Sequence, residues 1–446
     1  MSARIDFTLG FNTQKPAHER GHDNGLLIYV LGNFSGRQQD TPAQRKIRKI
    51  DIDNFEQVMT LIKPTLAIDP TASLTFETID DFHPDSWLEK VRLLSDWQRL
   101  KKKLNEPALA AQASAAIQAY YRAETNSDAP IQTNEAKESQ QDTLQRLLGD
   151  KPKKTGARQD SVDHLIERIV SPYVQEDASP QLQVLTSEID AISSELLRTL
   201  LHRQDFQRLE ALWRATEGLI NEEGGDEHDF FLVDIDQAEL LAELRHDKGS
   251  AFEQRLLQHA HSIADYGDIL LVGDHYFSDS EDDQDLMQYC SRLAKACAGS
   301  YLGSTAPSLL DLAIATDPEI KPVGAKDVLL SCPRYLLRLP YGDKREPLDT
   351  FSFEECPNLP QTHELLWGNP AFLCARVLIR NQLKQEEARF YFDDIPAFSF
   401  EQDGEPRLQP GTERVLTENQ INALLSQGII ALIGFHRRPG VRLAIF

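Results

Sequence analysis

The 446-residue chain has little positive charge and little sulfur. Lys and Arg total 47 against 70 Asp and Glu, so the formal net charge is −23. This balance argues against nucleic acid and anionic membranes as partners, because both recruit clustered cations. The five cysteines include no CxxC pair. This usage predicts reduced thiols in a cytoplasmic protein, packed as small apolar residues, rather than a zinc site.

Long apolar runs and catalytic signatures are also missing. No segment reaches the ~20 apolar residues that span a bilayer, and the longest runs, such as Leu26–Leu31 and Ile429–Phe435, have the length of core strands. The first residues contain no continuous apolar stretch, so we expect no secretory signal. A phosphate loop with its lysine and a Gly-x-Ser-x-Gly elbow are both absent from the sequence. We therefore predict no cofactor and no enzymatic activity.

The sequence alternates amphipathic helices with short apolar strands, a pattern that predicts a mixed α/β (α+β) fold. Helices are predicted at Asn54–Ile62, from Pro84 onward, Val162–Val170, Thr186–Arg203, Phe206–Leu219, Ser250–Ala264 and Asp285–Ala298. Strands are predicted at Gly25–Leu31, Leu66–Phe76 (a hairpin), Phe230–Ile235, Asp268–Val272, Arg334–Leu339, Ala388–Phe392 and Gly440–Phe446.

A polar stretch divides the chain. Residues 124–160 are rich in Thr, Asn, Ser, Gln and charged residues, which favours a linker over a packed domain. We therefore predict two modules, residues 1–123 and 161–446, joined by this linker.

The segment Arg4–Phe11 has the alternation of a strand with one apolar face. That face carries Ile5, Phe7, Leu9 and Phe11. A polar, Pro- and Gly-containing loop, Lys15–Asn24, follows it. Two interpretations stay open: the strand pairs within its own sheet, or it lies outside its domain and is exchanged with a partner, because an unpaired edge invites pairing.

Two groups of short motifs, far apart in the chain, carry the strongest signal. In the first, Leu31–Arg37 reads LGNFSGR and is followed by Ile52-Asp53-Asn54-Phe55. The positions of interest here are Gly32, Phe34, Gly36, Arg37, Asp53, Asn54 and Phe55. This group resembles the small contractile-sheath subunit of the type VI secretion system, which usually has Asp where this chain has Asn33.

The second group lies between residues 201 and 369. Its positions of interest are Phe206, Leu209, Glu210, Trp213, Arg214, Arg338, Pro340, Tyr341, Gly342, Phe353, Glu355, Trp367, Gly368 and Asn369. These motifs are similar, in the same order, to those of the large sheath subunit of the same system. The chain thus resembles a fusion of the two subunits.

The resemblance implies a structural role without catalysis. It implies strand and helix pairing with other sheath-like subunits, inner-tube or baseplate proteins, and recycling by an ATP-driven unfoldase. The large subunit runs on beyond the position equivalent to Phe446, where this sequence ends. A lattice needs each subunit both to donate and to accept, so we expect a cap or accessory. A building block of a shortened sheath and a scaffold that has lost assembly are the alternatives.

One alternative belongs to another class of protein. Asp265, Asp268, Asp274 and His275 lie close in sequence and offer ligands for a metal-dependent hydrolase. The acidic run Asp279–Asp285 lacks the central Gly and final Glu of an EF-hand loop, and it suits the start of a helix instead.

Overall fold

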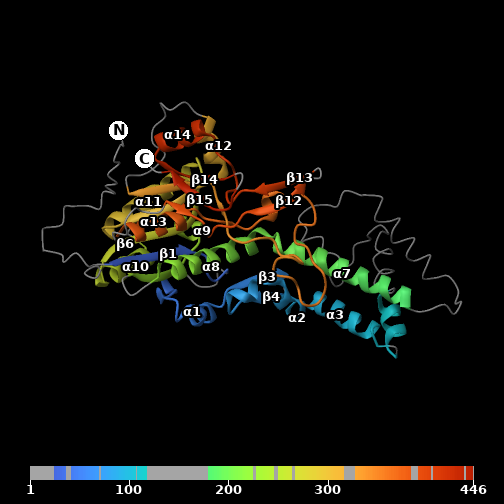
Figure 1. Cartoon of the computed structure of the whole chain (residues 1–446). Coiled ribbons are helices and arrows are strands. Elements are labelled where there is room, and N and C mark those ends of the chain that lie inside the picture. The colour runs from blue at the N-terminus through green and yellow to red at the C-terminus, as the bar shows by residue number, and fades with distance from the viewer. Residues whose placement is uncertain are drawn as a thin grey trace, which may run out of the picture.

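The computed structural model describes residues 25–36, 42–69, 72–106, 108–117, 179–224, 228–245, 250–263, 267–315, 327–382, 390–402, 405–435 and 438–444. The predicted strand Arg4–Phe11, the linker 124–160 and the predicted helix Val162–Val170 lie outside these ranges. Within them, the predicted mixed α/β fold is confirmed: one large sheet is packed between helices, and three two-stranded sheets stand beside it (Figure 1).

The large sheet has nine strands in the order β11-β15-β14-β8-β7-β6-β1-β5-β2. Its strands are β1 (Gly25–Gly32), β2 (Arg48–Ile50), β5 (Asp229–Asp234), β6 (Gly267–Phe277), β7 (Ser300–Thr305), β8 (Val328–Cys332), β11 (Tyr391–Phe392), β14 (Ile429–Gly434) and β15 (Val441–Ala444). The six strands from β14 to β5 run parallel, and the strands at the edges are antiparallel. The smaller sheets pair β3 (Thr65–Asp69) with β4 (Ala72–Thr75), β9 (Tyr335–Leu336) with β10 (Trp367–Gly368), and β12 (Phe398–Gln402) with β13 (Glu405–Gln409).

Strand β1 comes from the first predicted module and lies in the middle of a sheet built mainly from the second. Tyr29 stands opposite Phe231 of β5 on one side and Leu271 of β6 on the other. The run from Leu26 to Leu31 is buried throughout, as expected for a parallel strand covered on both faces. The two predicted modules therefore share one sheet.

Helices cover both faces of this sheet. One face packs against α7 (Ser179–Leu201), α8 (Gln204–Glu223) and α13 (Ala371–Gln382). The other packs against α9 (Gln237–Leu244), α10 (Ala251–Ile263), α11 (Glu281–Ala296), α12 (Pro307–Ala315) and α14 (Glu418–Ser426). Alternate residues of β1 enter the two cores, Ile28 on the α8 side and Tyr29 on the α11 side. The crossover from β1 to β5 and the return from β5 to β6 use opposite faces, as right-handed connections require.

The remaining elements come mostly from the first module. They are α1 (Phe55–Ile62), α2 (Trp87–Lys90), α3 (Arg92–Leu104) and the 3-10 turns η1 (Pro42–Gln44), η2 (Ile79–Phe82) and η3 (Pro84–Ser86), with η5 (Thr362–Glu364) in the second. Helices α3 and α7 run side by side away from the sheet (Figure 1) and share a separate apolar cluster with the helical turns at 110–117.

Several predicted elements differ from the structure. The strand predicted at Arg334–Leu339 is confined to Tyr335–Leu336, and of the one predicted at Ala388–Phe392 the described part is Tyr391–Phe392. The helix predicted from Pro84 is broken at Val91, whose backbone is extended. The break lets Trp87 enter the main core while Trp97 packs against α7 in the separate cluster. Strand β6 continues to Phe277 instead of ending at Val272, with a register shift between Val272 and Tyr276. The polar pair Asp274-His275 hides this extension in the sequence.

A search for membrane-spanning helices among the described residues found no candidate of sufficient length and hydrophobicity.

Candidate functional site

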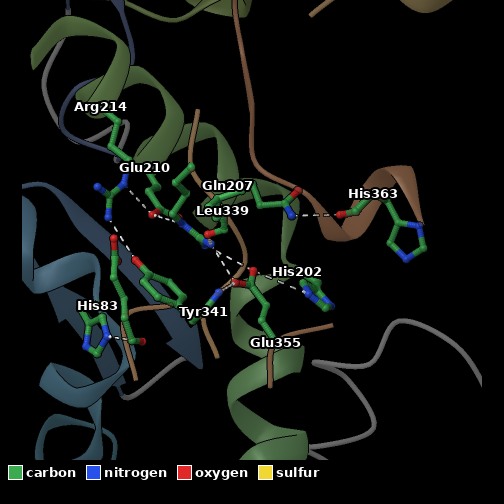
Figure 2. Close-up of polar contacts among 11 residues, drawn as sticks. His83, His202, Gln207, Glu210, Arg214, Leu339, Tyr341, Glu355 and His363 are labelled. Atoms are coloured by element: carbon green, nitrogen blue, oxygen red, sulfur yellow. Dashed lines mark hydrogen bonds and ion pairs between the residues drawn. The ribbon is translucent and has the colours of Figure 1, made fainter. Parts of the chain in front are cut away.

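Three motifs that are far apart in the sequence meet in one buried cluster of charges, which we call the Arg338 network (Figure 2). Its members are Glu210, Arg214, Arg338, Tyr341 and Glu355. All five are motif positions singled out from the sequence. The helix motif Leu201–Arg214, the motif Arg338–Gly342 (RLPYG) and the motif Phe351–Glu355 (FSFEE) therefore form a single three-dimensional site.

Local structure explains how the side chains meet. Helix α8 holds Glu210 and Arg214 one turn apart, so their side chains lie on the same face. Arg338 follows the short strand β9. The chain then folds back on itself, and the Glu355 N–H donates to the carbonyl of Tyr341 at 2.9 Å. This turn places Glu355 beside Arg338.

Arg338 lies at the centre and bridges two carboxylates. Its Nε and Nη2 donate to Glu210 at 2.8 and 3.2 Å, and its Nη1 donates to Glu355 at 2.7 Å. Arg214 donates from Nε to Glu210 at 2.8 Å and from Nη2 to the Tyr341 hydroxyl at 3.0 Å. The guanidinium of Arg338 also stacks 4.0 Å from the centre of the Tyr341 ring. Each carboxylate therefore has several donors, as buried charges require.

The two arginines of the network balance the charges of its two glutamates, and its central side chains are shielded from solvent. The side chains of Glu210, Glu355 and Arg338 are 0%, 1% and 8% exposed. Burial acts to raise the pKa of Glu210, but Arg338 and Arg214 outweigh it and the pKa is lowered. Glu355 is paired with one arginine, Arg338, whereas Glu210 is paired with two. Burial raises the pKa of Glu355. Carboxylates held in this way stabilise a conformation and do not present a free base to a substrate.

Three histidines and a glutamine lie around this network. Burial lowers the pKa of His202 to about 4, and its Nε2 lies 3.9 Å from a Glu355 oxygen. The His83 ring meets Tyr341 edge-on at 4.9 Å. Gln207 donates to the carbonyl of His363 at 2.9 Å. His202 and Gln207 lie within the motif Leu201–Arg214, whereas only proximity in the fold connects His83 and His363 with the network.

The motifs of the first module pack against α8. The Trp213 indole N–H donates to the carbonyl of Phe34 at 3.0 Å. The rings of Phe34 and Phe55 meet Trp213 edge-on at 5.1 and 5.7 Å. At Gly32 a Cβ would lie 2.7 Å from Cδ2 of Leu212, so a larger residue would displace that side chain. These motif residues therefore act as packing contacts between the two modules.

The other motif positions in this region form turns. The Gly36 N–H donates to the side chain of Asn33 at 2.9 Å, and Gly36 has a φ of +66°. Asn54 exchanges hydrogen bonds with Asp51 at the start of α1. Asp53 is exposed in the same turn, and Arg37 lies outside the described residues.

Asn369 connects strands β6 and β7 to the start of α13. Its side-chain oxygen accepts from Ser304 at 2.5 Å and from the N–H of Ala371 at 2.9 Å. Its amide donates to Asp274 at 3.2 Å. The neighbouring positions Trp367 and Gly368 form β10 and pair with β9, the strand just before Arg338.

The residues proposed for a metal-dependent hydrolase do not converge. Asp274 faces Asn369 on the α13 side of the sheet, whereas His275 bonds to Tyr301 in the opposite core. Asp268 lies six residues from Asp274 along the strand, roughly 20 Å away, and Asp265 lies outside the described residues. Across the described ranges, no group of three or more His, Cys, Asp or Glu side chains is placed to hold a metal. This geometry gives the hydrolase interpretation no support.

The acidic run Asp279–Asp285 begins α11, as its composition predicted. The Ser280 hydroxyl accepts from the Asp283 N–H at 3.2 Å and caps the helix. Asp283 itself binds the Ser278 N–H at 2.8 Å and the side chain of Gln237 at 2.8 Å. Glu281, Asp282 and Asp285 remain exposed on the surface.

Replacing Arg338 tests the energetic weight of the network. The substitution Arg338→Met leaves Glu210 and Glu355 buried without their shared cation, so we expect the free energy of unfolding to fall by about 3–5 kcal/mol. Adding Glu355→Gln removes one stranded charge and recovers part of this loss. Urea denaturation followed by circular dichroism measures both.

The control is Arg245→Met, which breaks the exposed ion pair with Asp282, where the side chains are 66% and 63% exposed. A surface pair contributes at most about 1 kcal/mol. Equal losses for Arg245→Met and Arg338→Met would contradict a structural role for the network.

A second prediction concerns pH. Burial lowers the pKa of His275 from 6.5 to about 4. Between these values the unfolded chain binds a proton that the folded chain does not, so the free energy of unfolding falls as the pH falls. We expect wild-type protein to lose about 2 kcal/mol more than His275→Asn between pH 7 and pH 4.5. Urea denaturation at both pH values measures the difference, and an exposed-site variant, His261→Asn, should behave as wild type. Parallel curves for wild type and His275→Asn would refute this prediction.

Comparison with known proteins agrees with the two groups of motifs. Residues 3–120 match the family model "Type VI secretion system, VipA, VC_A0107 or Hcp2". Residues 183–319 and 324–441 match the model "EvpB/VC_A0108, tail sheath N-terminal domain". The "Type VI secretion system sheath protein TssC1" of Pseudomonas aeruginosa is 24% identical over 307 residues, which are 61% of this chain and 61% of that protein. The chain belongs to the sheath proteins of the type VI secretion system and carries the small- and large-subunit regions on one polypeptide.

Proposed function

We propose that this chain is a non-enzymatic structural component of a type VI secretion sheath and acts as one preassembled unit. The observation that carries the proposal is the position of β1 between β5 and β6. This strand lies in the region that matches the VipA model, and its two neighbours lie in the region that matches the tail-sheath model. Backbone pairing thus joins what the resemblance assigns to two separate subunits.

Fusion of the two regions fixes their ratio at one to one. It also replaces an encounter between two molecules with a contact inside one chain, which raises the effective concentration of each region for the other. The contacts of Trp213 with Phe34 and Phe55 support the same assignment, since they bury aromatic groups of both regions together. An enzyme would instead need accessible acid or base groups, and those of the Arg338 network are already engaged.

We place this protein at the end of a sheath, as a cap or accessory. Within the described ranges, the edges of the large sheet are β2, with three residues, and β11, with two. Edges this short offer little backbone for an incoming strand. A subunit that contacts neighbours on one side only ends a lattice, whereas a subunit that contacts them on both sides extends it. A building block of a shortened sheath is the alternative.

Other sheath-like subunits are the proposed direct partners, with strand and helix pairing as the mode of contact. The apolar face of Ile5, Phe7, Leu9 and Phe11 is the proposed donor strand. The family resemblance adds inner-tube or baseplate proteins and a recycling unfoldase. We propose a cytoplasmic location, which agrees with five free thiols.

Electron microscopy of mixtures tests this function. We would incubate the purified full-length chain with preassembled sheaths of ordinary small and large subunits and examine negatively stained samples. The chain should form no tubules alone and should bind sheath ends. Ile5→Asp with Phe7→Asp should reduce end binding at least tenfold, because it places charges on the apolar face.

The matched control is Thr8→Asp, which the alternation of the predicted strand assigns to the opposite face and which should bind as wild type. Long tubules formed by the chain alone would overturn the cap assignment in favour of a building block. Absence of any association with sheath subunits, in tubules or in solution, would overturn the sheath function itself.

A further inference from the structure

One surface of the large sheet carries exposed cations and half-buried rings. We call it the edge patch, and its residues are Tyr391, Ile433, Phe435, Arg438 and Arg442. The register places Tyr391 of β11 opposite Arg442 of β15, and Arg442 opposite Ile433 of β14. Tyr391, Arg442 and Ile433 thus lie in one row across three neighbouring strands, and Phe435 and Arg438 lie between β14 and β15 in the sequence.

The aromatic residues of the patch hold a guanidinium in place. The Tyr391 and Phe435 rings lie 5.7 Å apart. Arg438 stacks on both, with its guanidinium carbon 4.1 Å from the Phe435 centre and 5.1 Å from the Tyr391 centre. Stacking of this kind fixes the flat face of an arginine and leaves its edge free to donate hydrogen bonds.

The two arginines of the patch have no ion-pair partner among the described residues, although the chain is rich in carboxylates. Nearby, Arg376 and Arg380 on α13 show the usual arrangement, since both bind Glu223 on α8 at 3.0 and 2.5 Å. Arg438 and Arg442 are exposed. Tyrosine, phenylalanine and arginine gathered at one place are the composition of protein-interface hot spots.

We propose that the edge patch binds the acidic first turn of α11 on a second copy of this chain. That turn presents Glu281 and Asp282 to solvent, and Asp285 is exposed just after it; Asp282 also pairs with Arg245 at 3.0 Å. Carboxylates are the groups that an arginine fork recognises best. The inference concerns self-association and does not depend on binding to sheath ends.

Charge explains why the contact would be specific. Two copies with a net charge of −23 repel each other in most orientations. Approach is favourable only where a cationic surface of one copy meets an acidic surface of the other. Arg442 and Ile433 lie on the face of the sheet that α11 covers, as the burial of Ala431 and Ala444 on that side shows. The patch and the acidic turn therefore face the same side of the molecule.

Sedimentation velocity of the full-length chain at several concentrations tests the proposal. Wild-type protein should form dimers, held by two reciprocal patch-to-turn contacts, at 50 mM salt, and raising salt to 500 mM should weaken association by about tenfold or more. The variant Arg438→Glu with Arg442→Glu and the variant Glu281→Arg with Asp285→Arg should each be monomeric.

An equimolar mixture of the two variants gives the decisive result. The acidic patch of the first variant then meets the basic turn of the second, so association should return in the mixture alone. Circular dichroism and thermal unfolding confirm that both variants are folded.

The control is Arg92→Glu with Arg99→Glu on α3, where the side chains are 88% and 74% exposed. It changes the net charge by the same amount as the patch variant and should associate as wild type. Monomeric wild-type protein at all concentrations, association that does not respond to salt, or a mixture that stays monomeric would each overturn the proposal.

Discussion

The backbone pairing of β1 with both β5 and β6 is the constraint on which the rest of this structure depends. A parallel strand in the middle of a sheet is bonded on two sides and covered on two faces, so it cannot leave without opening both cores. Leu26–Leu31 contributes alternate side chains to those cores. The two sheath regions of this chain therefore share one sheet and both of its cores.

The Arg338 network adds specificity to this arrangement. Buried ion pairs contribute little net stability compared with apolar packing, but they make alternative packings costly because a displaced charge would be stranded. Arg338 can satisfy Glu210 and Glu355 only if β9, α8 and the turn at Tyr341 are all in place. This dependence explains why three motifs that are far apart in the sequence occur together: their charged residues complete one network.

Much of the fold could be predicted from local pattern, and the site could not. The apolar run of β1 and the periodicity of α8 predicted both elements, since burial on two faces and on one face leave different signatures. The order of the strands depends on long-range pairing, which no local pattern encodes. The break at Val91 and the roles of His83 and His202 follow from which cores lie nearby. The sequence identified Glu210 and Arg338 as motif residues, but only the folded structure shows that these two side chains are in contact.

Hydrogen exchange of the full-length chain, measured by mass spectrometry, tests the central claim most directly. If β1 holds the two regions together, its amides should exchange with the same opening free energy as those of β5 and β6, because one cooperative unfolding event exposes all three. Exchange of β1 at a lower free energy, while β5 and β6 stay protected, would show that the first region detaches by itself and would contradict the account.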